Sequence, residues 1–74
     1  MIKVKIFGVV RLKAGVSDFE TNVKTLHDLL GMIPGISRKE AKDLVVLVNG
    51  HSVKRSYHFQ DGDEVSLLAP AGGG

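Results

Sequence analysis

The stretch IKVKIFG, residues 2–8, decides the fold of this chain. Its isoleucines and valine occupy the even positions, and its two lysines occupy the odd ones. Successive side chains of an extended strand point to opposite faces, so this alternation is typical of a β-strand with one buried face. Phe7 continues the odd positions, and we therefore expect its side chain to point outward with the lysines.

Further strands are predicted on both sides of the middle of the chain. Residues 9–15 are interpreted as a turn, and residues 18–23 as the second strand of a hairpin. The apolar run LVVLV, residues 44–48, predicts a strand with apolar side chains on both faces. Asn49-Gly50 directly after it is a strong signal for a tight turn. Residues 64–69 predict a final strand after another turn.

Two helices are predicted between these strands. Thr25 has the character of an N-cap, and residues 26–33 carry leucine and isoleucine at i, i+3, i+4 and i+7, an apolar helical stripe. Pro34-Gly35 ends this helix. Ser37 and Glu40 have the spacing of a capping box and begin a second, shorter helix. The order of elements predicts the α+β class, with a mixed sheet of four to five strands packed on one main helix.

The size and composition of the chain exclude several classes of function. The 74 residues are 43% apolar and carry a net charge of +2, without cysteine. One small domain burying about 60% of its unfolded surface has little material for a catalytic cleft, so we expect no enzyme. The basic residues are scattered and there is no apolar run of about 18 residues, so neither nucleic acid nor membrane is expected as a partner. We expect a cytoplasmic protein.

Metal binding is not predicted either. Three histidines, His27, His51 and His58, fit no ligand spacing, and no cysteine supports them. Asp61 and Asp63 flank a glycine, as residues that form turns do.

The glycines at positions 72–74 are the most informative feature for function. Glycine has no Cβ and is costly to order, so a run of it adds nothing to a core. We expect residues 1–69 to form the domain and residues 70–74 a flexible tail, which spans roughly 16 Å when extended. The tail could enter a narrow channel and present the Gly74 carboxylate. The alternative is a frayed end or an expression scar.

Together these motifs resemble the ubiquitin-like β-grasp proteins and, more closely, the MoaD/ThiS family of sulfur carriers. The resemblance runs along nearly the whole chain, and the stretches that carry it are residues 2–8, 46–50, 61–65 and 73–74. Arg11-Leu12 and Gly15 match the branch that contains the small subunit of molybdopterin synthase. The resemblance implies the β-grasp fold and a carrier that is not itself an enzyme.

The resemblance also implies the chemistry of the tail. An ATP-dependent, ubiquitin-activating-type enzyme would adenylate the Gly74 carboxylate, and a persulfide on a sulfur-donor protein would displace AMP to leave a thiocarboxylate. Gly72 and Gly73 would allow the tail to thread into that enzyme and then into a larger synthase subunit. The carrier would bind no cofactor itself, since its partner uses the ATP. The sulfur would enter molybdopterin, the organic part of the molybdenum or tungsten cofactor.

The folded domain would then need a docking surface for these partners. Parity places Phe7 and Leu68 on the outward face of the sheet, with Val45 or Leu47 beside them. Contiguous exposed apolar surface often marks a partner site, and Arg11 could border it. The alternative is that Phe7 is covered by a loop or is a single exposed aromatic side chain.

Three other functions stay open at this point. The chain could carry sulfur for the thiazole of thiamin or for another sulfur metabolite. It could be a ubiquitin-like modifier joined through Gly74 to lysines of other proteins. It could also be an interaction domain whose tail has no function.

Overall fold

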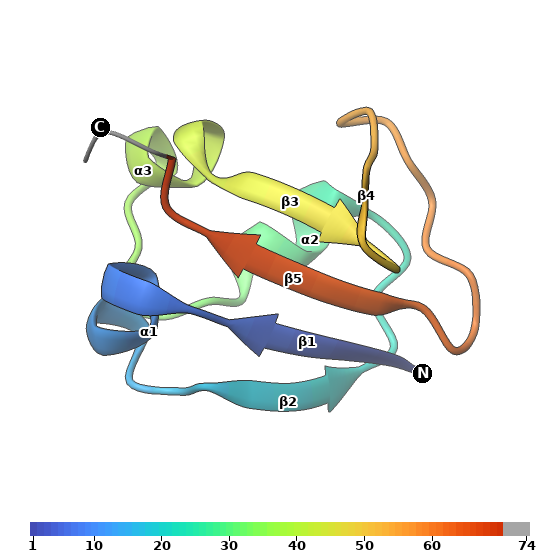
Figure 1. Ribbon diagram of the computed structural model, residues 1–74, viewed down its shortest axis with the longest axis horizontal. Coiled ribbons are helices and arrows are strands. Elements are labelled where there is room, and N and C mark those ends of the chain that lie inside the picture. The colour runs from blue at the N-terminus through green and yellow to red at the C-terminus, as the bar shows by residue number, and fades with distance from the viewer. Residues whose placement is uncertain (71–74) are drawn as a thin grey trace.

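The computed structural model describes residues 1–70, which form a five-stranded mixed sheet with three short helices (Figure 1). The strand order across the sheet is β2-β1-β5-β3-β4. The strands are β1 (Ile2–Ile6), β2 (Asp18–Thr21), β3 (Val45–Val48), β4 (His51–Ser52) and β5 (Glu64–Leu68). The helices are α1 (Gly8–Ala14), α2 (Leu26–Gly31) and α3 (Arg38–Asp43). The predicted α+β class with a mixed sheet is confirmed, and none of these helices is long enough to cross a membrane.

The centre of the sheet is the parallel pair formed by the first and last strands. Val4 of β1 lies opposite Val65 of β5, and Ile6 lies opposite Leu67. On the other side of β5, the antiparallel strand β3 places Val46 opposite the same Leu67. All five side chains are buried. The alternation in residues 2–6 thus gives the buried face that the sequence predicts.

Helix α2 lies behind the sheet and closes the core from that side (Figure 1). Leu26 and Leu29 of α2 are buried, and so is Ile33 just beyond it. The predicted N-cap is confirmed, because the Thr25 hydroxyl accepts a hydrogen bond from the Asp28 N–H at 3.2 Å. An unpaired N–H at a helix start is satisfied in this way.

The segment interpreted as a turn, residues 9–15, belongs to helix α1 as far as Ala14 instead. Val10 and Ala14 of α1 are both buried, and their i, i+4 spacing puts them on one face of the helix. Gly15 ends the helix with φ 75°, and its N–H donates to the carbonyl of Arg11 at 3.0 Å. The interpretation was wrong because one pair of core positions in seven residues is too short a pattern to show helical periodicity.

The stretch between β4 and β5, for which the sequence predicts no element, is held by the buried carboxylate of Asp63. One carboxylate oxygen accepts hydrogen bonds from the Tyr57 hydroxyl and the Gln60 N–H, both at 2.8 Å, and the other accepts from the Asn49 side chain at 3.0 Å. The pKa of Asp63 is lowered, chiefly by the hydrogen bond that its carboxylate accepts from the Gln60 N–H.

The predicted tight turn after β3 is confirmed. Asn49 and Gly50 have φ values of 52° and 83°, and such a turn requires positive φ at both positions.

Gly35 lets the loop between α2 and α3 lie directly on the backbone of α1. Its φ is 74°, and a Cβ on this residue would overlap the carbonyl oxygen of Lys13. Two separate obstacles, the left-handed backbone and the contact with α1, therefore exclude a side chain at this position.

We expect Gly35→Ala to lower the free energy of unfolding by more than about 2 kcal/mol, because strain in the backbone and a steric overlap add. Urea denaturation measures the change. Gly31→Ala is the matched control. Gly31 has an ordinary φ and open space around its Cβ position, so its replacement is expected to change stability by less than about 1 kcal/mol. Equal effects of the two substitutions would contradict the close approach of loop and helix.

Candidate functional site

The end of β5 leads through Ala69 and Pro70, here called the tail root, toward the glycines. Ala69 is exposed and Pro70 is half-buried. The predicted site residues Gly72, Gly73 and Gly74 lie outside the described residues, so their roles and the predicted domain boundary stay predictions. The structure describes the surface around the tail root, which precedes this part of the sequence.

The tail root lines a hollow of about 190 Å³ between α1 and α3. Val9, Val10 and Lys13 line it from α1, and Glu40 and Asp43 line it from α3. The sequence does not predict this hollow, because the segment of α1 was interpreted as a turn.

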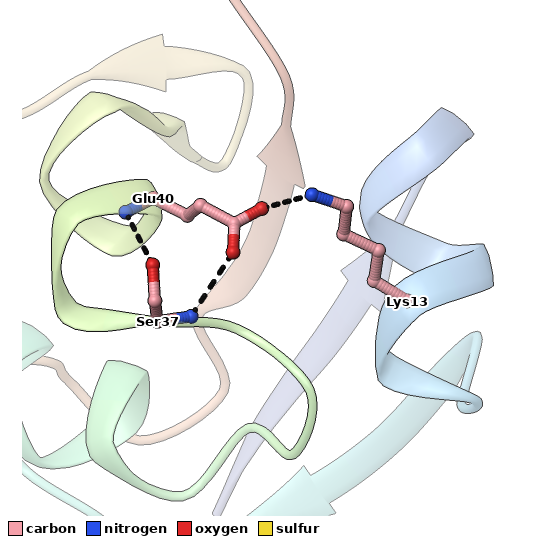
Figure 2. Close-up of polar contacts among 3 residues, drawn as sticks. All are labelled: Lys13, Ser37 and Glu40. Atoms are coloured by element: carbon pink, nitrogen blue, oxygen red, sulfur yellow. Dashed lines mark hydrogen bonds and ion pairs between the residues drawn. The ribbon is translucent and has the colours of Figure 1, made fainter.

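An ion pair between the Lys13 ammonium and the Glu40 carboxylate joins the two helices beside the hollow (Figure 2). The same carboxylate accepts the Ser37 N–H at 3.2 Å, and the Ser37 hydroxyl accepts the Glu40 N–H at 3.1 Å. The predicted capping box is thereby confirmed. Lys13 and, after it, the Ser37 N–H hold the pKa of Glu40 below its ordinary value. One side chain thus both begins α3 and ties it to α1.

The outer face of the sheet carries an apolar patch at the end from which the tail root departs. Val45 lies opposite Leu68 in the register of β3 and β5. The Phe7 N–H donates to the carbonyl of Leu67 at 3.1 Å, which continues the β1–β5 pairing by one residue and aligns Phe7 with Leu68. Phe7 is 45% exposed, Val45 is 38% exposed, and Leu68 is half-buried. We call these three residues, Phe7, Val45 and Leu68, the sheet patch.

The register also decides between the two β3 residues that the sequence left open. Val45 is the neighbour of Leu68 in the sheet patch. Leu47 lies two residues further along β3, opposite Ser66, and is half-buried. Leu47 is therefore on the same face but not in the row that borders the tail root.

Beyond this row, charged residues occupy the outer face of β1 and β2 and the start of β5. Lys3 lies opposite Glu20 on one neighbouring strand and Glu64 on the other. Lys5 lies opposite Asp18 of β2. Opposite charges on directly facing strand positions attract one another. On β1 and β5 the apolar surface of the outer face therefore lies at the end beside the tail root, and Leu47 extends it along β3.

Helix α1 adds exposed apolar side chains that the sequence reading missed. Leu12 is 76% exposed and Val9 is also exposed. Arg11, predicted to border the docking surface, is exposed on the same helix and joins none of the ion pairs found among residues 1–70. Apolar residues at every third or fourth position would have indicated a helix here. With seven residues, α1 is too short for that pattern to be recognised.

No group of three or more His, Cys, Asp or Glu side chains is arranged to hold a metal ion in the part of the chain that the structure describes.

Comparison with protein families gives a match to the family described as the ThiS family, over residues 4–74. No curated protein matches the chain.

Among solved structures, the chain is similar to a putative molybdopterin converting factor, subunit 1, from Pyrococcus furiosus. The two are 26% identical with a TM-score of 0.74, over 95% of this chain and 97% of that one. SAMP1 from Haloferax volcanii shares the fold at 22% identity and a TM-score of 0.72, with 99% and 98% covered. A complex of subunits 1 and 2 of molybdopterin-converting factor from Helicobacter pylori contains a chain that shares it at 23% identity and a TM-score of 0.72, with 99% and 97% covered. These likenesses confirm the predicted ubiquitin-like β-grasp fold.

Removal of the ammonium group in Lys13→Met is expected to raise the pKa of Glu40 toward its ordinary value, since Lys13 is the first cause of its lowering. A carboxylate whose pKa is lowered by folding stabilises the protein above its unfolded pKa, and this contribution is lost as the pH falls through the folded pKa. Lys13→Met should therefore reduce stability at neutral pH, and the difference from the unmodified protein should shrink in acid.

Carboxyl-carbon NMR titration measures this pKa, and denaturation at neutral and acidic pH measures the stability difference. Lys39→Met on α3 removes an equal charge outside the ion pair and serves as the control. An unchanged pKa of Glu40 in Lys13→Met would contradict the pairing of the helices.

Proposed function

The chain belongs to the ThiS family of ubiquitin-like sulfur carriers, and from that premise we propose that it carries sulfur as a thiocarboxylate on Gly74 for molybdopterin biosynthesis. The observation that carries the proposal is the reach of the family match, which runs through the glycines to residue 74. The similarity to the Pyrococcus furiosus protein, a putative molybdopterin converting factor subunit, supports molybdopterin as the destination.

The proposed chemistry takes place on the backbone carboxylate of Gly74. A carboxylate oxygen attacks the α-phosphorus of ATP in the activating enzyme, and pyrophosphate leaves. The terminal sulfur of a donor persulfide then attacks the acyl carbon of this adenylate, and AMP leaves. A second thiol then attacks the donor-side sulfur of the resulting acyl disulfide. This thiol and the donor sulfur form a disulfide, the original S–S bond breaks, and the thiocarboxylate stays on the carrier. The absence of Cβ atoms from Gly72 and Gly73 allows the tail to enter both active sites.

The sheet patch is the proposed docking surface for the partners. Phe7 and Leu68 would supply apolar contact area beside the tail root, Leu47 would extend it along β3, and Arg11 would border it on α1. A partner bound to this surface holds the start of the tail close to its own active site. The Helicobacter pylori structure contains subunits 1 and 2 together, and we propose a larger synthase subunit of that kind as the acceptor of this tail.

Incubation with the cognate activating enzyme, ATP and a sulfur donor is expected to raise the intact mass of the protein by about 16 Da, because one sulfur replaces one oxygen. Omission of ATP, and deletion of Gly73 and Gly74, are the two controls, and neither reaction should show the change. The mass of the protein isolated from its native host establishes whether Gly74 carries a free carboxylate there, as the proposal requires. No mass change with any cognate activating enzyme would contradict a sulfur carrier.

The sulfur-loaded carrier from this experiment also distinguishes molybdopterin from the other possible destinations of the sulfur. Formation of molybdopterin from its precursor by the larger subunit and the sulfur-loaded carrier is the expected result. Transfer to a thiazole synthase alone would favour the thiamin pathway. Isopeptide-linked adducts in the host lysate, without thiocarboxylate, would favour a protein modifier.

A further inference from the structure

A second hollow, the α2–α3 groove, lies on the side of α3 away from the tail root. Its volume is about 860 Å³. Arg38, Ala41 and Lys42 line it from α3, whereas Glu40 and Asp43 line the hollow at the tail root. The spacing of these residues puts the two sets on opposite faces of the helix. Helix α3 therefore turns a basic face to one hollow and an acidic face to the other.

The lining of the α2–α3 groove combines an apolar floor with a basic rim. The floor consists of buried and half-buried aliphatic side chains: Leu26, Leu30, Ile33 and Ile36. The rim consists of the exposed residues Arg38, Lys42 and Arg55, with His27 beside them. None of the residues that line this groove is acidic.

One of the basic side chains is fixed in place. A single guanidinium nitrogen of Arg55 donates to the carbonyls of Lys42, at 2.7 Å, and Leu44, at 3.0 Å. These carbonyls lie at the C-terminal end of α3, where a cation is favourable. Arginine has five N–H donors in a rigid fork, so these two bonds leave other donors on the same group. Neither Arg38 nor Lys42 takes part in an ion pair within residues 1–70.

We propose that the α2–α3 groove binds an acidic amphipathic segment of a partner protein. Aliphatic side chains of the segment cover the floor, and its Asp or Glu side chains pair with Arg38, Lys42 and Arg55. Complementary charge around an apolar contact fixes the orientation of such a segment and suppresses wrong partners.

The chemistry of the groove favours this occupant over the others. A small anion would pair with the rim but leave the aliphatic floor in water. A second copy of the chain that placed the same groove against this one would bring the two basic rims together. A single-stranded nucleic acid needs aromatic side chains for its bases to stack on, and the groove lining contains none.

The groove and the sheet patch are separate surfaces. Helix α2 packs behind the sheet (Figure 1), while the sheet patch is on the outward face. Both can be occupied at once, so a segment bound in the groove would leave the sheet patch and the tail root accessible. This inference does not depend on sulfur chemistry at Gly74.

The test is a titration of the ¹⁵N-labelled protein with a synthetic peptide that has leucines at i and i+4 flanked by glutamates. Amide shifts are expected at Leu30, Ile36 and Ala41, and binding should weaken with rising salt. A peptide with glutamine in place of every glutamate is the control for charge. A chain without Gly73 and Gly74 should bind equally well, which separates this result from the test of the sulfur carrier.

Variants on a single helix localise the contact. Lys42→Glu is expected to weaken binding of the acidic peptide about tenfold or more, because it places like charges together in the groove. Lys39→Glu changes the net charge equally on α3 but does not line the groove, and it should change the affinity less than about twofold. Both positions are exposed, and circular dichroism checks that both variants are folded.

Four results would overturn the proposal: equal binding of the glutamine peptide, equal weakening by both variants, shifts that lie outside the groove, or no binding. Inorganic phosphate that shifts the amides of Arg38 and Lys42 when the peptide does not would identify an anion site instead. A dimer in sedimentation experiments that Lys42→Glu dissociates would identify a contact between copies of this chain.

Discussion

The parallel pairing of β1 with β5 is the contact on which the rest of this structure depends. It joins the first and last strands of the chain, and buried valine, isoleucine and leucine side chains form its inner face. The pairing also determines where β5 ends. Because Phe7 continues β1 next to the end of β5, the chain leaves the sheet beside an exposed aromatic side chain and the start of α1. The location of the candidate site is therefore a consequence of strand register.

The two helices at that end give the tail root its surroundings. The pair of Lys13 and Glu40 joins α1 to α3 (Figure 2), and Gly35 lets the intervening loop approach the α1 backbone. An exposed ion pair alone contributes little to stability, so the close packing at Gly35 is the stronger constraint. Apart from Lys39, the charged residues of α3 line either the hollow at the tail root or the α2–α3 groove. Two surfaces with different chemistry result from one helix of six residues.

Features that depend on neighbouring residues were predictable from the sequence, and features that depend on distant ones were not. The alternation of residues 2–6, the N-cap at Thr25 and the Asn49-Gly50 turn are local, and each is present as predicted. Helix α1 was missed because few of its residues face the core. The pair of Lys13 and Glu40 joins residues 27 apart in sequence, and no local pattern indicates such a contact.

The candidate site also has features that the sequence predicts and features that it does not. Parity correctly placed Phe7 and Leu68 on the outward face, because the period of a strand is local. Only the register of β3 with β5 could show that Val45, and not Leu47, borders them. The central claim is that the sheet patch docks a partner so that Gly74 can react. ATP–pyrophosphate exchange by the cognate activating enzyme, at subsaturating carrier, tests it with Val45→Glu and with Met32→Glu, a similarly exposed apolar position away from the patch. The account predicts that exchange falls about tenfold or more with Val45→Glu and is unchanged with Met32→Glu; equal exchange with the two variants would contradict it.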